Sequence, residues 1–193
     1  MPTPSLRQVI GVPDSTASVE DSVLIVIDAQ DEYIYGQLPA VDYAEVNIAI
    51  SGLLEKYRKR NGQVVHVVHN TGSDETPIFT RSGSLTKEMD GIEAVDGEAI
   101  VHKKHAGSFS ETKLGEVLEK VGLRKLVLTG YMAHGCVSST AREAATLGYE
   151  VVVAEDGVGQ RDINDIPAAE IKRVALTAID DMFGTVVSSR DIV

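Results

Sequence analysis

Short apolar runs alternate with longer amphipathic segments along nearly the whole chain. The run SVLIVIDA, residues 22–29, is apolar at both odd and even positions, which is typical of a strand buried on both faces of a parallel sheet. Similar runs predict further strands at residues 63–69, 99–103, 125–130, 149–154 and 185–188. The pattern therefore predicts six strands.

Between these runs the apolar residues recur with a helical period. Val46 and Ile50 fall on one stripe of a predicted helix at residues 41–60. Ser110 is the expected N-cap of the next helix, and Pro167 suits the first turn of the last one. These later helices are predicted at residues 111–121, 136–147 and 167–182.

Strands that alternate with helices at short spacing imply right-handed crossovers between parallel strands. We therefore predict an α/β fold, a three-layer α/β/α arrangement with a central, mostly parallel six-stranded sheet of Rossmann-like topology. One domain is expected over residues 1–193, with residues 1–20 as an N-terminal extension. Ligands of such sheets bind beyond the carboxyl ends of the strands, and the long irregular stretch at 70–97 is expected to wall that site.

The charge of the chain argues against two classes of partner. It has 18 Lys and Arg against 29 Asp and Glu, a formal net charge of −11, whereas nucleic acids and anionic membrane surfaces require a basic face. The single cysteine cannot form an internal disulfide or, by itself, a structural zinc site. The first twenty residues contain no apolar run suited to a signal-peptide core. We expect a cytoplasmic protein whose partner is a small-molecule substrate, with no binding of nucleic acid or membrane.

Three reactive side chains follow predicted strands. Asp28 comes after the apolar run LIVI, where a carboxylate would be partly desolvated, although a turn-forming Asp is the simpler interpretation. Lys103 and Lys104 end the third strand and point to opposite faces, and a solvated charge is the ordinary role of either. Cys136 is the first residue of a predicted helix, whose N-terminus would lower the pKa of the thiol, although most single cysteines are structural.

Together these groups predict nucleophilic hydrolysis. A thiol needs a base to take its proton, which Asp28 can supply, and a lysine beside both groups would orient the carboxylate. Backbone N–H groups in the turn before Cys136 would hold an oxyanion. The expected reaction is acyl transfer to sulfur followed by hydrolysis.

Four blocks of sequence carry a resemblance to a known family. They are DAQDEY at 28–33, GEAIVHK at 97–103, SFSETKL at 108–114 and GYMAHGCVSSTA at 130–141. In this order they resemble the isochorismatase-like cysteine hydrolases, which include isochorismatases, nicotinamidases, N-carbamoylsarcosine amidohydrolases and ureidoacrylate amidohydrolases. The resemblance extends over about residues 20–190.

The resemblance implies an Asp–Lys–Cys catalytic triad at Asp28, Lys103 and Cys136. Lys103 is preferred to Lys104 because the family's lysine lies six positions before the phenylalanine that Phe109 matches.

The resemblance also implies a non-proline cis peptide at Met132–Ala133, which would direct amides toward an oxyanion. The chain departs from the family pattern nearby, because Ala133 stands where the family has threonine and His134 where nicotinamidases have aspartate. These differences leave the triad intact and leave the substrate open.

Five further residues are expected to line the substrate pocket: Gln30, Tyr33, His69, Phe109 and His134. Packing of the loop after Asp28 is the alternative for the first two, and a solvated imidazole is the alternative for His134. Nicotinamidases bind a metal through a D-x-H pair that this sequence does not contain, so no metal is expected. The GYMAHG turn fits no phosphate-binding fingerprint, so no nucleotide cofactor is expected.

The sequence leaves three functions open. The first is hydrolysis of a small-molecule amide or related C–N bond through a thioester at Cys136. The second is hydrolysis of the vinyl ether of isochorismate to pyruvate and a dihydroxycyclohexadiene acid, in which Asp28 acts as a general acid. Specialised isochorismatases tend to lack the cysteine, which favours the first. The third is a non-catalytic scaffold. The resemblance also implies a homo-oligomer, with the last helix and strand as interface material.

Overall fold

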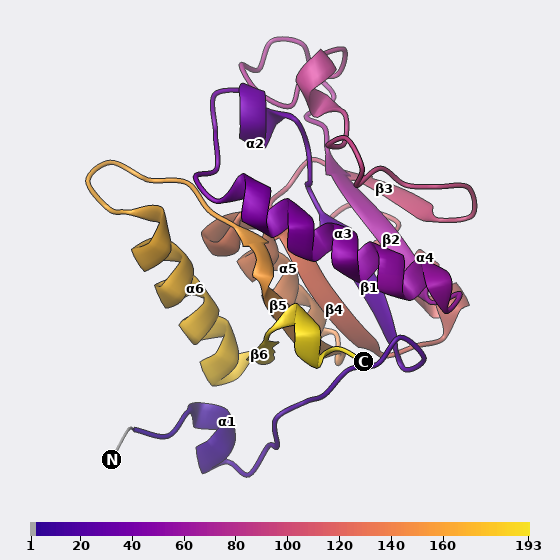
Figure 1. Ribbon diagram of the computed structural model, residues 1–193, viewed down its shortest axis with the longest axis vertical. Coiled ribbons are helices and arrows are strands. Elements are labelled where there is room, and N and C mark those ends of the chain that lie inside the picture. The colour runs from indigo at the N-terminus through magenta and orange to yellow at the C-terminus, as the bar shows by residue number, and fades with distance from the viewer. Residues whose placement is uncertain (1–2) are drawn as a thin grey trace.

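The computed structural model describes residues 3–193, which form a parallel sheet covered by helices on both faces (Figure 1). The strands are hydrogen-bonded in the order β3-β2-β1-β4-β5-β6, and every neighbouring pair is parallel. Their bounds are β1 Ser22–Ile27, β2 Gln63–His69, β3 Ala99–Lys103, β4 Lys125–Tyr131, β5 Glu150–Gly159 and β6 Thr185–Val187. The predicted three-layer α/β fold is confirmed, and the sheet is entirely parallel.

Alternate residues of each strand face opposite layers, which explains why the strand sequences are apolar at both parities. Leu24 and Val26 of β1 pack in the layer of α3, whereas Val23, Ile25 and Ile27 face the layer on the other side. Helix α3 (Tyr43–Lys59) therefore covers one face of the sheet, and the other face is covered by α4 (Leu114–Val121), α5 (Ser138–Thr146) and α6 (Ala168–Met182).

The carboxyl edge of the sheet lies beneath the long segment between β2 and β3. This segment contains the short helix η1 (Ser84–Thr86) and rises beside α2 (Glu32–Tyr35) at the top of Figure 1. The strand order reverses between β1 and β4, because β1 connects toward β2 and β4 connects toward β5. Such a reversal leaves room for a ligand at the carboxyl edge.

The expected N-terminal extension is folded onto the last helix. It contains the short helix α1 (Leu6–Val9), whose Leu6 N–H donates to Asp181 Oδ1 at 2.7 Å. The Arg7 guanidinium donates to the carbonyl of Gly184 at 2.5 Å, just after α6. These contacts place the N-terminal segment far from the carboxyl edge of the sheet (Figure 1).

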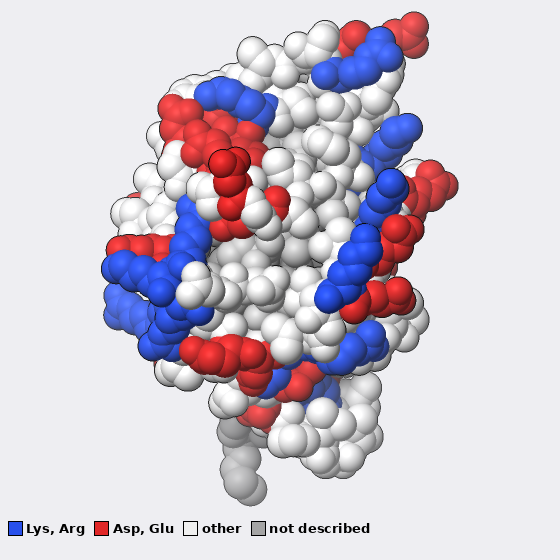
Figure 2. Space-filling model, turned by 90° about the vertical axis from the view of Figure 1, so that its right-hand side faces the viewer, with Lys and Arg blue, Asp and Glu red and all other residues white. Residues whose placement is uncertain are grey.

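Two surface properties bear on possible partners. Within residues 3–193 no helix combines the length and apolar character needed to cross a bilayer. On the face shown in Figure 2, acidic and basic side chains are interspersed around a largely uncharged centre. That face therefore differs from the continuous basic surface that nucleic acids bind.

The structure corrects two predicted helix starts. The helix expected from residue 111 begins at Leu114, because Ser110 donates its hydroxyl to Glu143 of α5 and does not cap the helix. Glu111 has a φ of +55°, which a helix does not accommodate. The helix expected from Cys136 begins at Ser138, and Cys136 lies in a preceding wide turn, η2 (Ala133–Val137).

Strand β5 continues beyond its predicted end at residue 154 and reaches Gly159. The polar residues Glu155 and Asp156 interrupt the apolar run, so the pattern hides the continuation. The pairing of β5 with β4 is irregular along this stretch and resumes beyond it, where Gly159 lies opposite Tyr131. The extension brings the residues that follow Gly159 to the carboxyl edge.

Candidate active site

Asp28, Lys103 and Cys136 meet at the carboxyl edge of the sheet. Lys103 Nζ lies 2.7 Å from Asp28 Oδ2 and donates to Cys136 Sγ at 3.2 Å. The Asp28 and Lys103 side chains are 0% exposed, whereas Lys104 is exposed to solvent. The structure thus brings together the three residues that the sequence singled out, and it selects Lys103 over its neighbour.

The backbone around Asp28 is held in an uncommon conformation. Asp28 has a φ of +50°, a left-handed value that is costly for a residue with a side chain. Its N–H donates to the carbonyl of Val67 on β2, and its carbonyl accepts from the N–H of Gln30, both at 2.8 Å. These two bonds fix the bend that turns the carboxylate toward Lys103.

Gly130 allows β4 to pass close to the end of β1. Its φ is +117°, and a Cβ atom there would lie 1.9 Å from the carbonyl oxygen of Ile27, the residue before Asp28. No side chain fits at that distance, so only glycine permits this approach. The close passage sets the separation between Asp28 and the turn that carries Cys136.

The electrostatics differ from what the sequence suggested for the thiol. Burial raises the pKa of Cys136 to about 12, the negative charge of Asp28 adds to the rise, and Lys103 only partly opposes it. The expectation of a lowered thiol pKa is therefore wrong, because burial and the charge of Asp28 outweigh the opposing effect of Lys103. At neutral pH the thiol keeps its proton.

Lys103 carries the positive charge of the site. Burial alone would lower its pKa, but the negative charge of Asp28 and the contacts of Nζ with Asp28 and Cys136 outweigh that effect and raise it. Asp28 Oδ1 is buried and has no hydrogen-bond partner within residues 3–193. This oxygen is thus free to accept a proton or a substrate hydrogen bond.

His69 is a fourth member of the cluster. Its Nδ1 lies 3.0 Å from Lys103 Nζ and 3.9 Å from Asp28 Oδ2, and its ring stacks on Phe79 with centroids 4.8 Å apart. Because an ammonium can only donate, Nδ1 accepts from Lys103 and the proton of a neutral ring is on Nε2. The imidazole therefore fixes the direction of the ammonium.

The same cluster has the spacing of a cation site. Atoms of Asp28, His69 and Cys136 that can ligate a metal lie within 4.8 Å of one another. Lys103 Nζ contacts all three residues, at 2.7, 3.0 and 3.2 Å respectively. Its ammonium therefore takes the position in which a metal ion would be bound.

Two of the expected pocket residues support the cluster from behind. Gln30 is buried, donates to the carbonyls of His69 and Thr86 at 2.9 and 2.7 Å, and accepts from the N–H of His69 at 2.8 Å. Tyr33 is buried between Tyr131 and Phe79, with ring centroids 5.2 and 5.5 Å away. Both hold the loop after Asp28 in place.

The other two expected pocket residues lie further from the cluster. Phe109 packs against Tyr149, next to the start of β5, so its ring is near the opposite edge of the sheet. His134 is exposed, and its ring Nδ1 contacts the side-chain oxygen Oε1 of Gln160 at 2.9 Å. This contact ties the η2 turn to the chain that follows β5.

The cis peptide lies one bond earlier than expected, at Tyr131–Met132 rather than Met132–Ala133. The Met132 carbonyl accepts from the N–H groups of Gly135 and Val137, at 3.0 and 3.2 Å. These bonds close the η2 turn and carry the chain from β4 to Cys136. The expected role of Met132 and Ala133 in holding an oxyanion stays a prediction.

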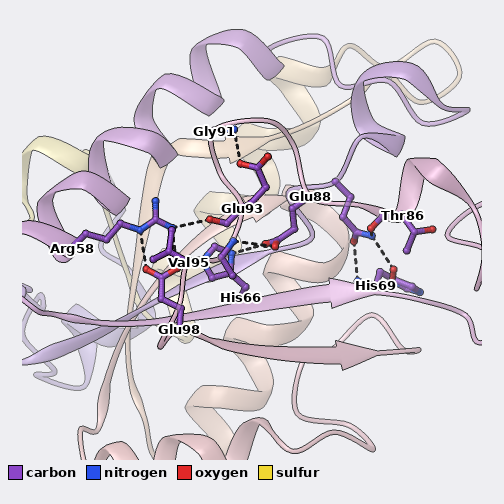
Figure 3. Close-up of polar contacts among 11 residues, drawn as sticks. Arg58, His66, His69, Thr86, Glu88, Gly91, Glu93, Val95 and Glu98 are labelled. Atoms are coloured by element: carbon purple, nitrogen blue, oxygen red, sulfur yellow. Dashed lines mark hydrogen bonds and ion pairs between the residues drawn. The ribbon is translucent and has the colours of Figure 1, made fainter.

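A buried ionic cluster fixes the segment above the site (Figure 3). His66 of β2 contacts Glu88 Oε1 through Nδ1 at 2.5 Å and Glu98 Oε2 through Nε2 at 3.1 Å. Arg58 of α3 donates to both oxygens of Glu98, at 2.8 and 2.9 Å. Because Glu88 also pairs through its backbone with Gln30, the cluster supports the loop after Asp28.

Sequence reasoning found the three central residues but missed their supports. Glu88 and Glu98 lie in a stretch without periodicity, so no pattern marked them as partners of His66. Gln160 was hidden by the early predicted end of β5. The distance of six residues between Lys103 and Phe109 pointed to the lysine that lies beside Asp28 and Cys136, even though Phe109 itself lies elsewhere.

Comparison with known proteins agrees with this geometry. The isochorismatase domain family matches residues 22–191. A protein of Verticillium dahliae named secreted isochorismatase effector Isc1 is 52% identical over 188 residues, covering 97% of this chain and 98% of its own. A ureidoacrylate amidohydrolase of Caulobacter vibrioides is more distant, at 28% identity over 88% of each chain.

Solved structures give the same result. The crystal structure of an isochorismatase from Pseudomonas putida superimposes with a TM-score of 0.93, at 30% identity, and covers 100% of both chains. The family match covers most of the sequence, and membership of that family accounts for both the fold and the cluster at the carboxyl edge. The chain belongs to the isochorismatase family of hydrolases.

Proposed function

We propose that the protein hydrolyses isochorismate at the cluster of Asp28, Lys103 and Cys136, with Asp28 as the proton donor. We infer the location of the reaction from one observation, the contact of Lys103 Nζ with both Asp28 and Cys136. The substrate is inferred from the relative named an isochorismatase effector, which is 52% identical over nearly the full length of both chains.

The reaction needs one proton and one water. Asp28, once protonated, donates to the methylene carbon of the vinyl ether, and water adds to the resulting oxocarbenium carbon. The hemiketal then breaks its C–O bond to release pyruvate and the dihydroxycyclohexadiene acid, and the proton lost by water restores Asp28. The Oδ1 atom of Asp28 supports this role, because it is buried and accepts no hydrogen bond from the described residues.

Hydrolysis of a C–N bond is the second candidate, and the position of Cys136 favours it. Asp28 would take the thiol proton while sulfur attacks the carbonyl carbon, and the amine would leave with that proton. Water would then cleave the thioester and release the acid. The ureidoacrylate amidohydrolase among the relatives supports this chemistry.

Kinetics on two substrate classes distinguish these candidates. Release of pyruvate from isochorismate is followed with lactate dehydrogenase, and small amides and ureido acids are followed by release of ammonia. We expect wild type and Cys136→Ala to release pyruvate and Asp28→Asn to lose about 100-fold or more in rate. Wild type that turns over an amide but not isochorismate would contradict the proposal, and loss of that activity in Cys136→Ala would support the thioester.

We further propose that the protein acts outside the cell that makes it. The support is the name of the 52% identical relative, a secreted effector, whereas the sequence predicted a cytoplasmic protein. An epitope-tagged chain expressed in its source cells should accumulate in the medium while a cytoplasmic marker stays inside. Retention of both proteins in the cells would contradict secretion.

The expected homo-oligomer stays a prediction. Helix α6 exposes Val174 and Met182, which are apolar side chains suited to contact a second copy. Light scattering on the purified protein should give a mass of at least twice 20.7 kDa. A mass of one chain at micromolar concentration would contradict the oligomer.

A further inference from the structure

His66 is a buried histidine that the proposed reaction does not use. It belongs to β2, its side chain is 0% exposed, and its neighbours in the sheet are apolar, Val26 on β1 and Ile100 on β3. The charged groups at the ring come from outside the sheet, because Glu88 contacts Nδ1 at 2.5 Å and Glu98 contacts Nε2 at 3.1 Å (Figure 3). Both ring nitrogens therefore face carboxylate oxygens.

The side chain of Glu98 is held as a carboxylate. Its two oxygens accept from Arg58 of α3, and Oε2 also accepts from the N–H of Val95 at 2.9 Å. Burial raises the pKa of Glu98, but Arg58, the Val95 N–H and the nearby His66 outweigh burial and lower it. Glu93 adds to the negative charge that acts on Arg58. Because a carboxylate can only accept, Nε2 of His66 carries a proton and donates it to Glu98.

The second contact, between His66 Nδ1 and Glu88 Oε1, needs a proton as well. A neutral ring that is protonated on Nε2 has a lone pair on Nδ1, which would repel a carboxylate oxygen 2.5 Å away. An imidazole is a stronger base than a carboxylate, which places this proton on the ring. With both nitrogens protonated, the ring and Arg58 together balance the two glutamates.

Glu88 lies in a short piece of chain that covers the loop after Asp28. Its backbone pairs with that of Gln30 in an antiparallel bridge. Hydrogen bonds on either side, at 3.1 and 2.9 Å, complete the contact of residues 87–89 with residues 29–31. A displacement of Glu88 would therefore release the loop that carries Asp28.

Glu98 directly precedes β3, the strand that ends in Lys103. We propose that His66 is a positioning residue, which as a cation holds Glu88 and Glu98 together and so sets the position of Asp28 relative to Lys103. Its effect on the rate rests on the proposed function, because protonation of the vinyl ether requires Asp28 at a fixed place beside the ammonium. The charge of His66 is independent of the substrate.

NMR of the histidine ring tests this charge. We expect N–H protons on both ring nitrogens of His66 at pH 7. Glu88→Gln should leave one, because an amide N–H can donate to Nδ1 and no anion then requires the second proton. Glu93→Gln is the matched control, since it removes the same charge from an exposed residue of the same segment, and it should leave both protons in place. A wild-type ring with a single N–H would overturn the proposal.

Hydrogen exchange tests the positioning without a substrate. Glu88→Ala removes the partner of Nδ1, so protection of the Met89 and Asp31 N–H groups, which bond to the covered loop and the covering chain, should fall about 10- to 100-fold at pH 7. Glu88→Gln keeps the hydrogen bond, and its protection should stay within about threefold of wild type, as should that of Glu93→Ala. Thermal unfolding monitors the fold of each variant. Full protection in Glu88→Ala would overturn the positioning role.

Kinetics connect the position to the rate. For isochorismate, Glu88→Ala should lower kcat about 10- to 100-fold with KM changed less than about threefold, and Glu88→Gln should restore kcat. An unchanged kcat beside lost protection would overturn the positioning role. Wild type that turns over an amide but not isochorismate would reject the proposed substrate, and the same comparison of kcat on the amide would then decide the role of His66.

Discussion

Replacing Lys103 by methionine tests the buried ion pair at the centre of the site. Nζ lies 2.7 Å from Asp28 Oδ2 with both side chains 0% exposed, so the variant leaves a carboxylate unpaired away from water. Removing one partner of such a pair costs about 3–5 kcal/mol. Protonating a carboxyl group of ordinary pKa at pH 7 costs about 4 kcal/mol, and this cost is the upper limit of the loss of stability. We expect the free energy of unfolding to fall by about 3–4 kcal/mol.

Urea denaturation followed by circular dichroism measures this difference. Lys104→Met is the matched control, since Lys104 is the exposed neighbour, and its effect should stay within about 0.5 kcal/mol. Adding Asp28→Asn to Lys103→Met removes the unpaired charge and should recover part of the loss. A loss below about 1 kcal/mol in Lys103→Met would refute the reasoning.

The pair also predicts a pH dependence. The pKa of Lys103 is raised in the folded protein, because Asp28 and Cys136 outweigh the effect of burial. The stabilisation is therefore complete below the ordinary lysine value of 10.5 and is lost as the pH rises through the folded value. Wild type should lose stability above that range, and Lys103→Met should lose less over the same range, because buried groups such as Cys136 and Tyr57 still contribute to the loss.

Three further outcomes are expected. Alkylation of Cys136 by iodoacetamide should accelerate about tenfold per pH unit from pH 7 to 10, because burial raises the thiol pKa to about 12; a plateau below pH 8 would contradict this. Glu98→Gln should lower the free energy of unfolding by about 1–3 kcal/mol at pH 7 in urea titrations. Burial raises the pKa of Glu98, but Arg58 outweighs burial and holds that pKa low. The difference between the variant and wild type should therefore vanish as the pH falls through this low value. Gly130→Ala should destabilise by more than about 3 kcal/mol in the same assay, because its Cβ would collide with the Ile27 carbonyl.

The sheet could be predicted because burial on both faces leaves a clear mark in the sequence. Leu24 and Ile25 face opposite layers and both must be apolar, so β1 could be recognised without its neighbours. The start of α4 could not, because the partner of Ser110 is Glu143, a residue 33 positions away. Contacts between distant segments decide such boundaries.

The central site residues could be predicted because parallel strands bring their carboxyl ends together. Asp28 follows β1 and Lys103 is the last residue of β3, so their meeting required only the topology. The high pKa of Cys136 could not be predicted, because burial depends on the packing of the whole site. Gln160 was missed because β5 continues past a polar interruption that looks like a strand end.

In the resting site, neither route has its reacting group in the protonation state that it needs. Burial beside Asp28 keeps the thiol of Cys136 protonated, because its pKa rises to about 12, and Lys103 is already paired with Asp28. A thioester route must first create a thiolate that competes with Asp28 for the same ammonium. The vinyl-ether route must likewise begin with a proton on Asp28, the ion-pair partner of Lys103. Both routes therefore start with a proton transfer that involves Asp28.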